Sequence, residues 1–141
     1  MNLVQQFSGL AMEKMPKVIS PKGHAIADYA MAAGAFAAAI AFFKTGHKAA
    51  GVGALIAGAV ETLNPMITDF PGGLFKLISF PTHGRVDVGA TSMVASLPKV
   101  MNLDGGMESK FFYIHSAAAM AVVAMTNFGG DGQKTTAEAE S

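Results

Sequence analysis

Two short stretches decide how this chain folds: "HAIAD" at residues 24–28 and "HGRVD" at residues 83–87. Both read His-x-x-x-Asp, both lead into a run of small and apolar residues, and they begin 59 residues apart. "TDFPGG" at 68–73 and "TNFGG" at 126–130 repeat in the same way, at an offset of 58. Anchor points with nearly constant spacing indicate one structural unit that is used twice.

The composition is that of an apolar protein with one domain. Of the 141 residues, 51% are hydrophobic and only 14% are charged, whereas roughly a quarter are charged in an ordinary soluble domain. The net charge is zero, so no basic face is expected for nucleic acid. The chain has no cysteine, which excludes disulfides, thiolate metal ligands and a cysteine nucleophile.

Four apolar segments follow one another along the chain, each close to the ~20 residues that cross ~30 Å of hydrocarbon as a helix. They run from about His24 to Phe43, Ala49 to Ile67, Thr82 to Met101 and Phe111 to Phe128. Each is apolar all round rather than on one stripe, which is typical of buried or lipid-facing helices. We therefore predict an all-α fold, a four-transmembrane-helix bundle made of two tandem hairpin repeats. A soluble four-helix bundle is the alternative.

The repeat divides the chain into four parts. They are an N-terminal segment (1–20), a first hairpin repeat (21–73), a linker with the second hairpin repeat (74–130) and a disordered polar tail (131–141). In the N-terminal segment Leu3, Phe7 and Leu10 recur at helical spacing. This predicts a short amphipathic helix on the membrane surface, with a frayed terminus as the alternative.

Small residues recur every fourth position in the first two segments. The two sets are Ala33, Ala37 and Ala41, and Ala50, Ala54 and Gly58. Such small-xxx-small patterns let helix backbones approach closely in lipid. We therefore expect both sets to face neighbouring helices.

Two helices per repeat return the chain to the side on which it started. The repeated motifs should therefore gather at one end of the bundle. They comprise His24, Asp28, Thr68, Asp69, His83, Asp87, Thr126 and Asn127. His47 and His115 are expected at the opposite end.

The pattern "GHAIADYAMAAG…TDFPGG…ISFPTHGRVDVGATS…FYIH…TNF", over roughly residues 20–130, resembles the SPW-repeat family of small bacterial integral membrane proteins. In that family each of two hairpins begins with His-x-x-x-Asp, and Thr-Asp-aromatic often closes the first hairpin. His115 in "YIH" resembles a histidine that the family often places early in its fourth helix. Ser-Pro-Trp itself is not retained, since "AFF" stands at 41–43 and "SLP" at 96–98. The resemblance implies the four-helix membrane fold and no particular activity.

The two His-x-x-x-Asp pairs are candidate metal ligands. Residues at i and i+4 lie on one helical face, so two such pairs at one depth supply two imidazoles and two carboxylates, enough for a divalent ion. The first interpretation is a structural clamp in which each aspartate hydrogen-bonds its histidine. The alternatives are a site for a metal or another ligand at His24, Asp28, His83 and Asp87, and a catalytic or proton-handling site. A haem with His24 and His83 as axial ligands is a further alternative.

Glu61 is a second candidate, because an acidic residue inside a span is costly and marks a site by default. We expect it near Asp28 and His24, which would suit a membrane enzyme or a proton- or ion-handling protein. The further polar candidates are Asp69, Arg85 and His115. Arg85 is expected to reach the lipid headgroups or to pair with an aspartate.

These observations predict a small, non-enzymatic membrane scaffold or subunit, since the chain carries no recognised catalytic motif. We expect a multi-pass protein of the inner cell membrane. Lysine and arginine are slightly more numerous on the side of the two termini, which favours cytoplasmic termini. Expected partners are the lipid bilayer and either another membrane protein or a second copy of the chain, with no nucleic acid.

Overall fold

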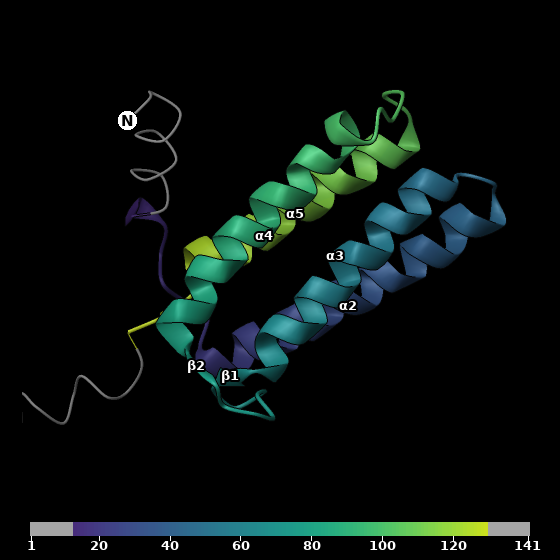
Figure 1. Ribbon diagram of the computed structural model, residues 1–141. Coiled ribbons are helices and arrows are strands. Elements are labelled where there is room, and N and C mark those ends of the chain that lie inside the picture. Colours follow the sequence, from purple (N-terminus) through teal and green to yellow (C-terminus); the bar gives the residue numbers. More distant parts are fainter. Residues whose placement is uncertain (1–12, 130–141) are drawn as a thin grey trace, which may run out of the picture.

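The computed structural model describes residues 13–129, in which four long helices form two hairpins (Figure 1). The helices are α2 (Pro21–Lys44), α3 (Lys48–Met66), α4 (Phe80–Val100) and α5 (Met107–Met125). This confirms the all-α fold and its hairpins α2–α3 and α4–α5. Of the predicted N-terminal helix, residues 1–12 lie outside the described residues, as does the predicted tail.

Two helices begin earlier than predicted because serine caps their first turns. Ser20 Oγ accepts a hydrogen bond from Gly23 N at 3.1 Å, and a proline follows within the first two helical positions. Ser79 Oγ accepts from Thr82 N at 3.4 Å in the second repeat. A serine cap followed by proline starts a helix with little strain. The repeat therefore includes "IS" at 19–20 and 78–79, a signal that the motif analysis missed.

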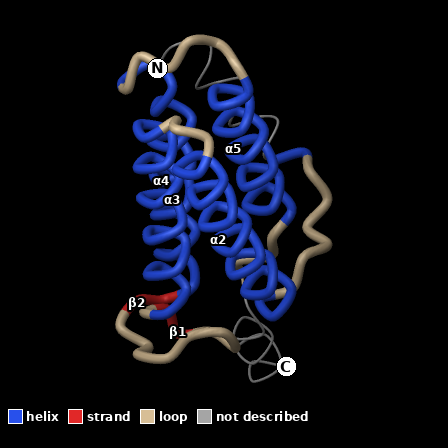
Figure 2. Tube along the Cα trace, turned by 90° about the vertical axis from the view of Figure 1, so that its right-hand side faces the viewer, coloured by secondary structure: helices blue, strands red, loops and turns tan. Residues whose placement is uncertain are grey.

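The ends of the two hairpins pair crosswise through short parallel strands (Figure 2). Strand β1 (Thr68–Asp69) closes the first hairpin and pairs with β2 (Ile78–Ser79), which opens the second. The equivalent bridge joins Ile19, before α2, to Thr126, after α5. Each hairpin therefore begins beside the end of the other, and the repeat is visible in the backbone as well as in the motifs.

The loop after β1 folds back onto the end of α3. The carbonyl of Met66 accepts from the backbone N–H groups of Leu74 at 2.8 Å and Phe75 at 2.9 Å. These bonds satisfy a carbonyl that the helix end leaves without a partner. A Cβ on Gly73 would lie 1.6 Å from Thr68 O, so only glycine fits this close approach.

Alanine is the commonest residue in the core of the bundle, whereas many large aliphatic side chains point outward. The main core cluster comprises Ala35, Ala39, Phe42, Ala50, Ala54, Ala57, Val94, Leu97 and Phe112. The exposed apolar side chains on the helices include Ile26, Ile40, Phe43, Val52, Leu55, Ile56, Leu63, Val86, Met93, Val100, Met107 and Ile114. A soluble bundle has the reverse distribution.

The two small-residue patterns have different outcomes. Ala50, Ala54 and Gly58 are buried, as predicted. Ala33, Ala37 and Ala41 are exposed instead, and α2 buries Ala32, Ala35 and Ala39. The buried face of α2 is the one that carries His24, since Ala35 lies three helical turns beyond it. The burial of that histidine therefore sets the rotation of the helix.

Among the helices in residues 13–129, α2 alone combines the length and apolarity of a membrane span. It has 24 residues and a mean hydropathy of 1.7 in its most apolar window. The core helix of a soluble protein can have the same composition. In α2, however, only 22% of that window is buried inside the bundle, so most of its apolar surface faces outward.

The small-residue core predicts that enlarging one buried alanine destabilises the bundle. Ala35 is fully buried, so Ala35→Leu should lower the free energy of unfolding by about 1–3 kcal/mol through overpacking. Thermal unfolding followed by far-UV circular dichroism measures this. Ala37→Leu on the exposed face of the same helix is the control, with an expected change within about 0.5 kcal/mol. Equal effects of the two substitutions would contradict the described core.

Candidate metal centre

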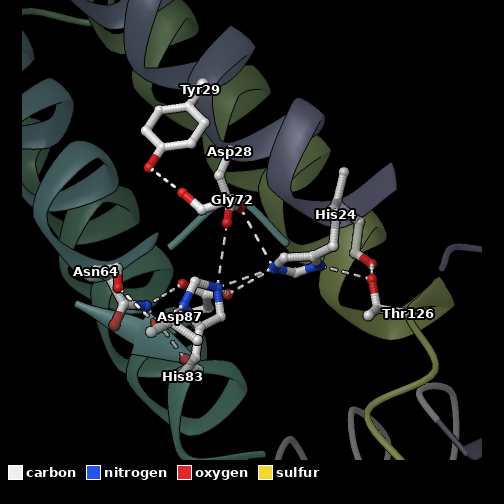
Figure 3. Close-up of polar contacts among 10 residues, drawn as sticks. His24, Asp28, Tyr29, Asn64, Gly72, His83, Asp87 and Thr126 are labelled. Atoms are coloured by element: carbon white, nitrogen blue, oxygen red, sulfur yellow. Dashed lines mark hydrogen bonds and ion pairs between the residues drawn. The ribbon is translucent and has the colours of Figure 1, made fainter. Parts of the chain in front are cut away.

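Four side chains from the two repeated motifs converge at the end of the bundle where the strands lie (Figure 3). We call His24, Asp28, His83 and Asp87 the His/Asp cluster. His24 and Asp28 come from α2, and His83 and Asp87 come from α4. One ligand atom from each of the four lies within 4.8 Å of the others. The predicted juxtaposition of the two motifs is thus present.

The cluster is tight, and both imidazoles face it through the same ring nitrogen. The two Nε2 atoms are 3.1 Å apart. Asp87 Oδ2 lies 3.0 Å from His24 Nε2 and 2.9 Å from His83 Nε2. Asp28 approaches the same two nitrogens with Oδ1 at 3.3 Å and Oδ2 at 3.2 Å. Both imidazoles are fully buried, so solvent does not screen these contacts.

Two threonine hydroxyls fix which ring nitrogen of each histidine carries a proton. Thr126 Oγ1 donates to Val122 O at 2.6 Å and lies 2.7 Å from His24 Nδ1. A hydroxyl has one proton to donate, so here it accepts from the Nδ1–H group. Thr68 repeats the arrangement, donating to Asn64 O at 2.6 Å and lying 2.8 Å from His83 Nδ1.

The consequence is that the Nε2 atoms are the ring nitrogens left to act inside the cluster. In a neutral imidazole with Nδ1–H, the Nε2 atom carries a lone pair. Two such lone pairs therefore face each other and the two carboxylates, and a positive charge is needed between them. Either protons or a metal ion can supply that charge. Hydrogen-bonding of the remote ring nitrogen is the usual outer-shell support of a histidine metal ligand.

The threonine contacts also cross between the hairpins. Thr68 ends the first hairpin and contacts His83 of the second, whereas Thr126 ends the second hairpin and contacts His24 of the first. The crosswise pairing of the strands places each threonine beside the other repeat's histidine. The repeat analysis predicted that these residues gather at one end but not that they exchange partners.

Asn64 is a cluster residue that the sequence analysis missed. Its Nδ2 donates to Asp87 Oδ1 at 2.6 Å and to His83 O at 3.3 Å. The first bond holds the outer oxygen of Asp87, so Oδ2 is directed into the cluster. A lone asparagine in an apolar helix was the available signal, because such a residue is costly unless hydrogen-bonded.

Three phenylalanines surround the imidazoles. The rings of Phe80 and Phe128 contact His24 edge-on, with centroids 5.4 and 5.3 Å away. Phe70 lies 5.2 Å from His83. These rings exclude water from the histidine side, which strengthens electrostatic interactions within the cluster.

The candidates Asp69 and Arg85 do not join the cluster. Asp69 is 63% exposed and forms an ion pair with Lys76 at 2.9 Å. Arg85 is exposed, which is compatible with the expected reach toward headgroups. Arg85 lies outside the cluster because His83 and Asp87 occupy the inward face of the start of α4, and Asp69 lies in β1.

Glu61 and His115 form a second buried pair. Glu61 Oε1 lies 2.6 Å from His115 Nε2. Glu61 thus hydrogen-bonds His115 and not His24 or Asp28, but it lines one cavity together with Asp28, in agreement with the expected proximity of the two carboxylates. His115 was expected at the opposite end of the bundle. It lies inside α5 instead, because that helix starts at Met107 rather than at Phe111.

A haem does not fit between His24 and His83. The macrocycle of a haem occupies the space between its two axial nitrogens. Here the two Nε2 atoms are within hydrogen-bonding distance of each other, and phenylalanine rings pack against the imidazoles. The haem alternative therefore has no structural support.

A single small cation does fit. Tetrahedral coordination with ligand bonds of 2.0–2.1 Å, as at zinc, gives about 3.3 Å between neighbouring ligand atoms. The nitrogen–nitrogen and nitrogen–oxygen separations in the cluster run from 2.9 to 3.3 Å. These nitrogen–nitrogen and nitrogen–oxygen separations are those of neighbouring ligands at one divalent ion, and one ligand atom from each of the four side chains lies within 4.8 Å of the others.

Comparison with known proteins identifies no relative of this chain. No family model, no curated protein and no solved structure matches it. The resemblance to SPW-repeat proteins therefore stays a prediction from short motifs. Any role for the chain has to be argued from the geometry of the cluster.

The threonine contacts predict that Thr68→Val destabilises the protein. The substitution preserves shape but leaves the buried Nδ1–H of His83 without an acceptor, at a cost of about 1–3 kcal/mol. Denaturant unfolding measures the effect, and Thr68→Ser should restore most of the stability. Thr62→Val is the matched control, because the Thr62 hydroxyl also bonds a carbonyl of its own helix, Gly58 O at 2.7 Å. Similar losses for Thr62→Val and Thr68→Val would contradict a special role for the histidine contact.

Proposed function

We propose that this chain is a small integral membrane protein in which the His/Asp cluster binds one divalent metal ion and so ties two helical hairpins together at one membrane face. The observation that carries the proposal is the convergence of two Nε2 atoms and two carboxylates at 2.9–3.3 Å. Both histidines are fully buried there. Each hairpin supplies one histidine and one aspartate, so a bound ion would cross-link the repeats.

The charge balance of the cluster favours a divalent ion. Two aspartate carboxylates supply two negative charges, and two imidazoles protonated only at Nδ1 supply none. A divalent cation makes the site neutral, which suits a buried location where an uncompensated charge is costly. If both imidazoles were instead protonated at Nε2, the two N–H groups would lie 3.1 Å apart and point at each other. Two nitrogen and two oxygen ligands in near-tetrahedral spacing favour Zn²⁺.

The inverted distribution of side-chain sizes supports a membrane location. Helix–helix contacts in lipid favour small residues, because backbones can then approach closely, while large aliphatic side chains face the acyl chains. The bundle follows this rule, with a core rich in alanine and an outer surface of isoleucine, leucine, valine, methionine and phenylalanine. The helices have 19 to 24 residues, the range needed to cross ~30 Å of hydrocarbon.

The resemblance to SPW-repeat proteins supports the same location, in the inner membrane of a bacterium with all four helices as spans. The start of α2 and the end of α5 then lie on the side of the His/Asp cluster, and the slight excess of lysine and arginine on that side favours a cytoplasmic location for it. In this arrangement the cluster lies near the lipid headgroups. The chain serves as a scaffold or subunit, and a second copy or another membrane protein is its expected partner.

Metal binding predicts that the purified protein takes up one Zn²⁺ or Co²⁺ per chain and gains stability. An ion at 100 times its Kd should stabilise the fold by about 2.7 kcal/mol. Loss of one ligand in His83→Ala should weaken binding by at least about 100-fold, since even outer-shell changes cost 10–100-fold. Isothermal titration and metal analysis provide the measurements.

The matched control is His47→Ala. His47 is half-exposed and pairs with Glu108 at 2.8 Å near the opposite end of the bundle. This variant should bind the ion with unchanged affinity. A wild-type protein that takes up no divalent ion would leave the cluster as a proton-bonded clamp and overturn the metal proposal.

The membrane location predicts that the protein sediments with membranes and is released by detergent but not by alkaline carbonate. A helix that spans the bilayer resists extraction by carbonate, because leaving the bilayer would expose its apolar outer surface to water. Immunoblotting of the fractions measures the distribution. Recovery of folded protein in the soluble fraction without detergent would disprove the four-span arrangement.

A further inference from the structure

We infer that the proposed metal ion carries one water molecule as an additional ligand, held in an internal cavity against Glu61. This inference rests on the proposed metal centre and adds to it an open coordination position. The cavity has a volume of about 30 Å³ and is lined in part by Asp28, Asp87 and Glu61. A water needs roughly 10–15 Å³ of such space, so one molecule fits and a larger ligand does not.

The position of the cavity determines which side of the ion is open. Asp28 and Asp87, the two oxygen ligands, both line it, whereas His24 and His83 do not. The histidines are backed instead by the phenylalanine rings and the threonine hydroxyls. A fifth ligand can therefore approach the ion only between the two aspartates, from the cavity.

The cavity wall presents a hydrogen-bond acceptor that lacks a donor. Glu61 Oε2 is buried and has no hydrogen-bond partner among the described residues, whereas Asp28 Oδ2 lies 3.2 Å from His83 Nε2 inside the cluster. A buried acceptor without a donor costs about 1–3 kcal/mol. A metal-bound water has two O–H groups, so one of them can donate to Glu61 Oε2. An anion would be repelled by the same carboxylates.

The repeat shows that this space is specific to one half of the cluster. At the offset of 58, Glu61 corresponds to Ala119 and Asn64 corresponds to Val122. Asn64 donates to Asp87, but Val122 offers Asp28 no donor. Ala119 and Val122 both line the cavity. The second hairpin thus carries apolar side chains at the two positions where the first carries polar ones, and these side chains line the cavity beside Asp28.

Glu61 is supported from behind by His115, whose Nε2 lies 2.6 Å from Oε1. This contact leaves Oε2 as the oxygen directed to the cavity. A carboxylate that accepts a hydrogen bond from metal-polarised water is the arrangement of a general base. Glu61 Oε2 would be the group that takes a proton from a water polarised by an ion in the His/Asp cluster, so Glu61 would act on water and not directly on His24.

Pulsed EPR of the Co²⁺-loaded full-length protein in ¹⁷O-enriched water tests the inference. We expect hyperfine coupling from one directly bound water oxygen in the wild-type protein. Ala119→Val places two methyl groups in the cavity and should abolish the coupling while Co²⁺ stays bound. Ala121→Val, at an exposed position of the same helix, is the matched control and should retain it. Glu61→Gln should keep the coupling, and Glu61→Met should lose most of it.

The outcomes separate this inference from the metal proposal. Stoichiometric Co²⁺ without ¹⁷O coupling in the wild-type protein would overturn the water ligand and leave the metal centre intact. Coupling that persists unchanged in a Co²⁺-loaded Ala119→Val protein would show that the water lies elsewhere and would overturn its placement. Failure of the wild-type protein to bind Co²⁺ would overturn both proposals. These decisions do not depend on the stability of any one variant, because the wild-type spectrum alone can refute the inference.

Discussion

The close approach of two histidine Nε2 atoms and two aspartate carboxylates is the constraint on which the rest of the structure depends. These groups repel one another unless a positive charge lies between them, and they are buried where water cannot screen the repulsion. The cluster lies at the end of the bundle where α2 and α4 begin and α3 and α5 end. There the β1–β2 pair and the Ile19–Thr126 bridge join the two hairpins. The hydrogen bonds to Thr126, Thr68 and Asn64 hold the histidines and Asp87 with their ligand atoms directed into the cluster.

Duplication explains how so small a chain builds such a site. One hairpin supplies a histidine, an aspartate and a threonine, but its threonine reaches the histidine of the other hairpin. Neither repeat can complete the cluster alone. Each alanine in the core between the helices buries little apolar area. The His/Asp cluster therefore holds the hairpins together at the strand end. Toward the opposite end, Phe42 contacts Phe111, with ring centroids 5.7 Å apart.

Much of this arrangement follows from the sequence, and the parts that do not have identifiable reasons. The constant spacing of the repeated motifs predicted the two hairpins and the proximity of His24 and His83, because a repeat constrains the topology without any knowledge of packing. The spacing of small residues alone did not predict the rotation of α2, since alanine occupies both its buried and its exposed faces, whereas the position of His24 indicates the buried face. The Glu61–His115 pair was missed because α5 begins at Met107, after the Gly106 cap, and not at Phe111, where the apolar run begins. His115 therefore lies farther inside the helix than predicted. Asn64 acts through a partner 23 positions away, which no local pattern reveals.

X-ray absorption spectroscopy of the Zn²⁺-loaded protein tests the central claim most directly. The cluster predicts a first shell of nitrogen and oxygen at about 2.0–2.1 Å, with outer-shell scattering from two imidazoles. The outer-shell scattering from the two imidazoles should be absent from the spectrum when His24 and His83 are both replaced. A shell of oxygen alone, or a spectrum that the double replacement leaves unchanged, would show that the ion binds elsewhere and would contradict the metal-linked pair of hairpins.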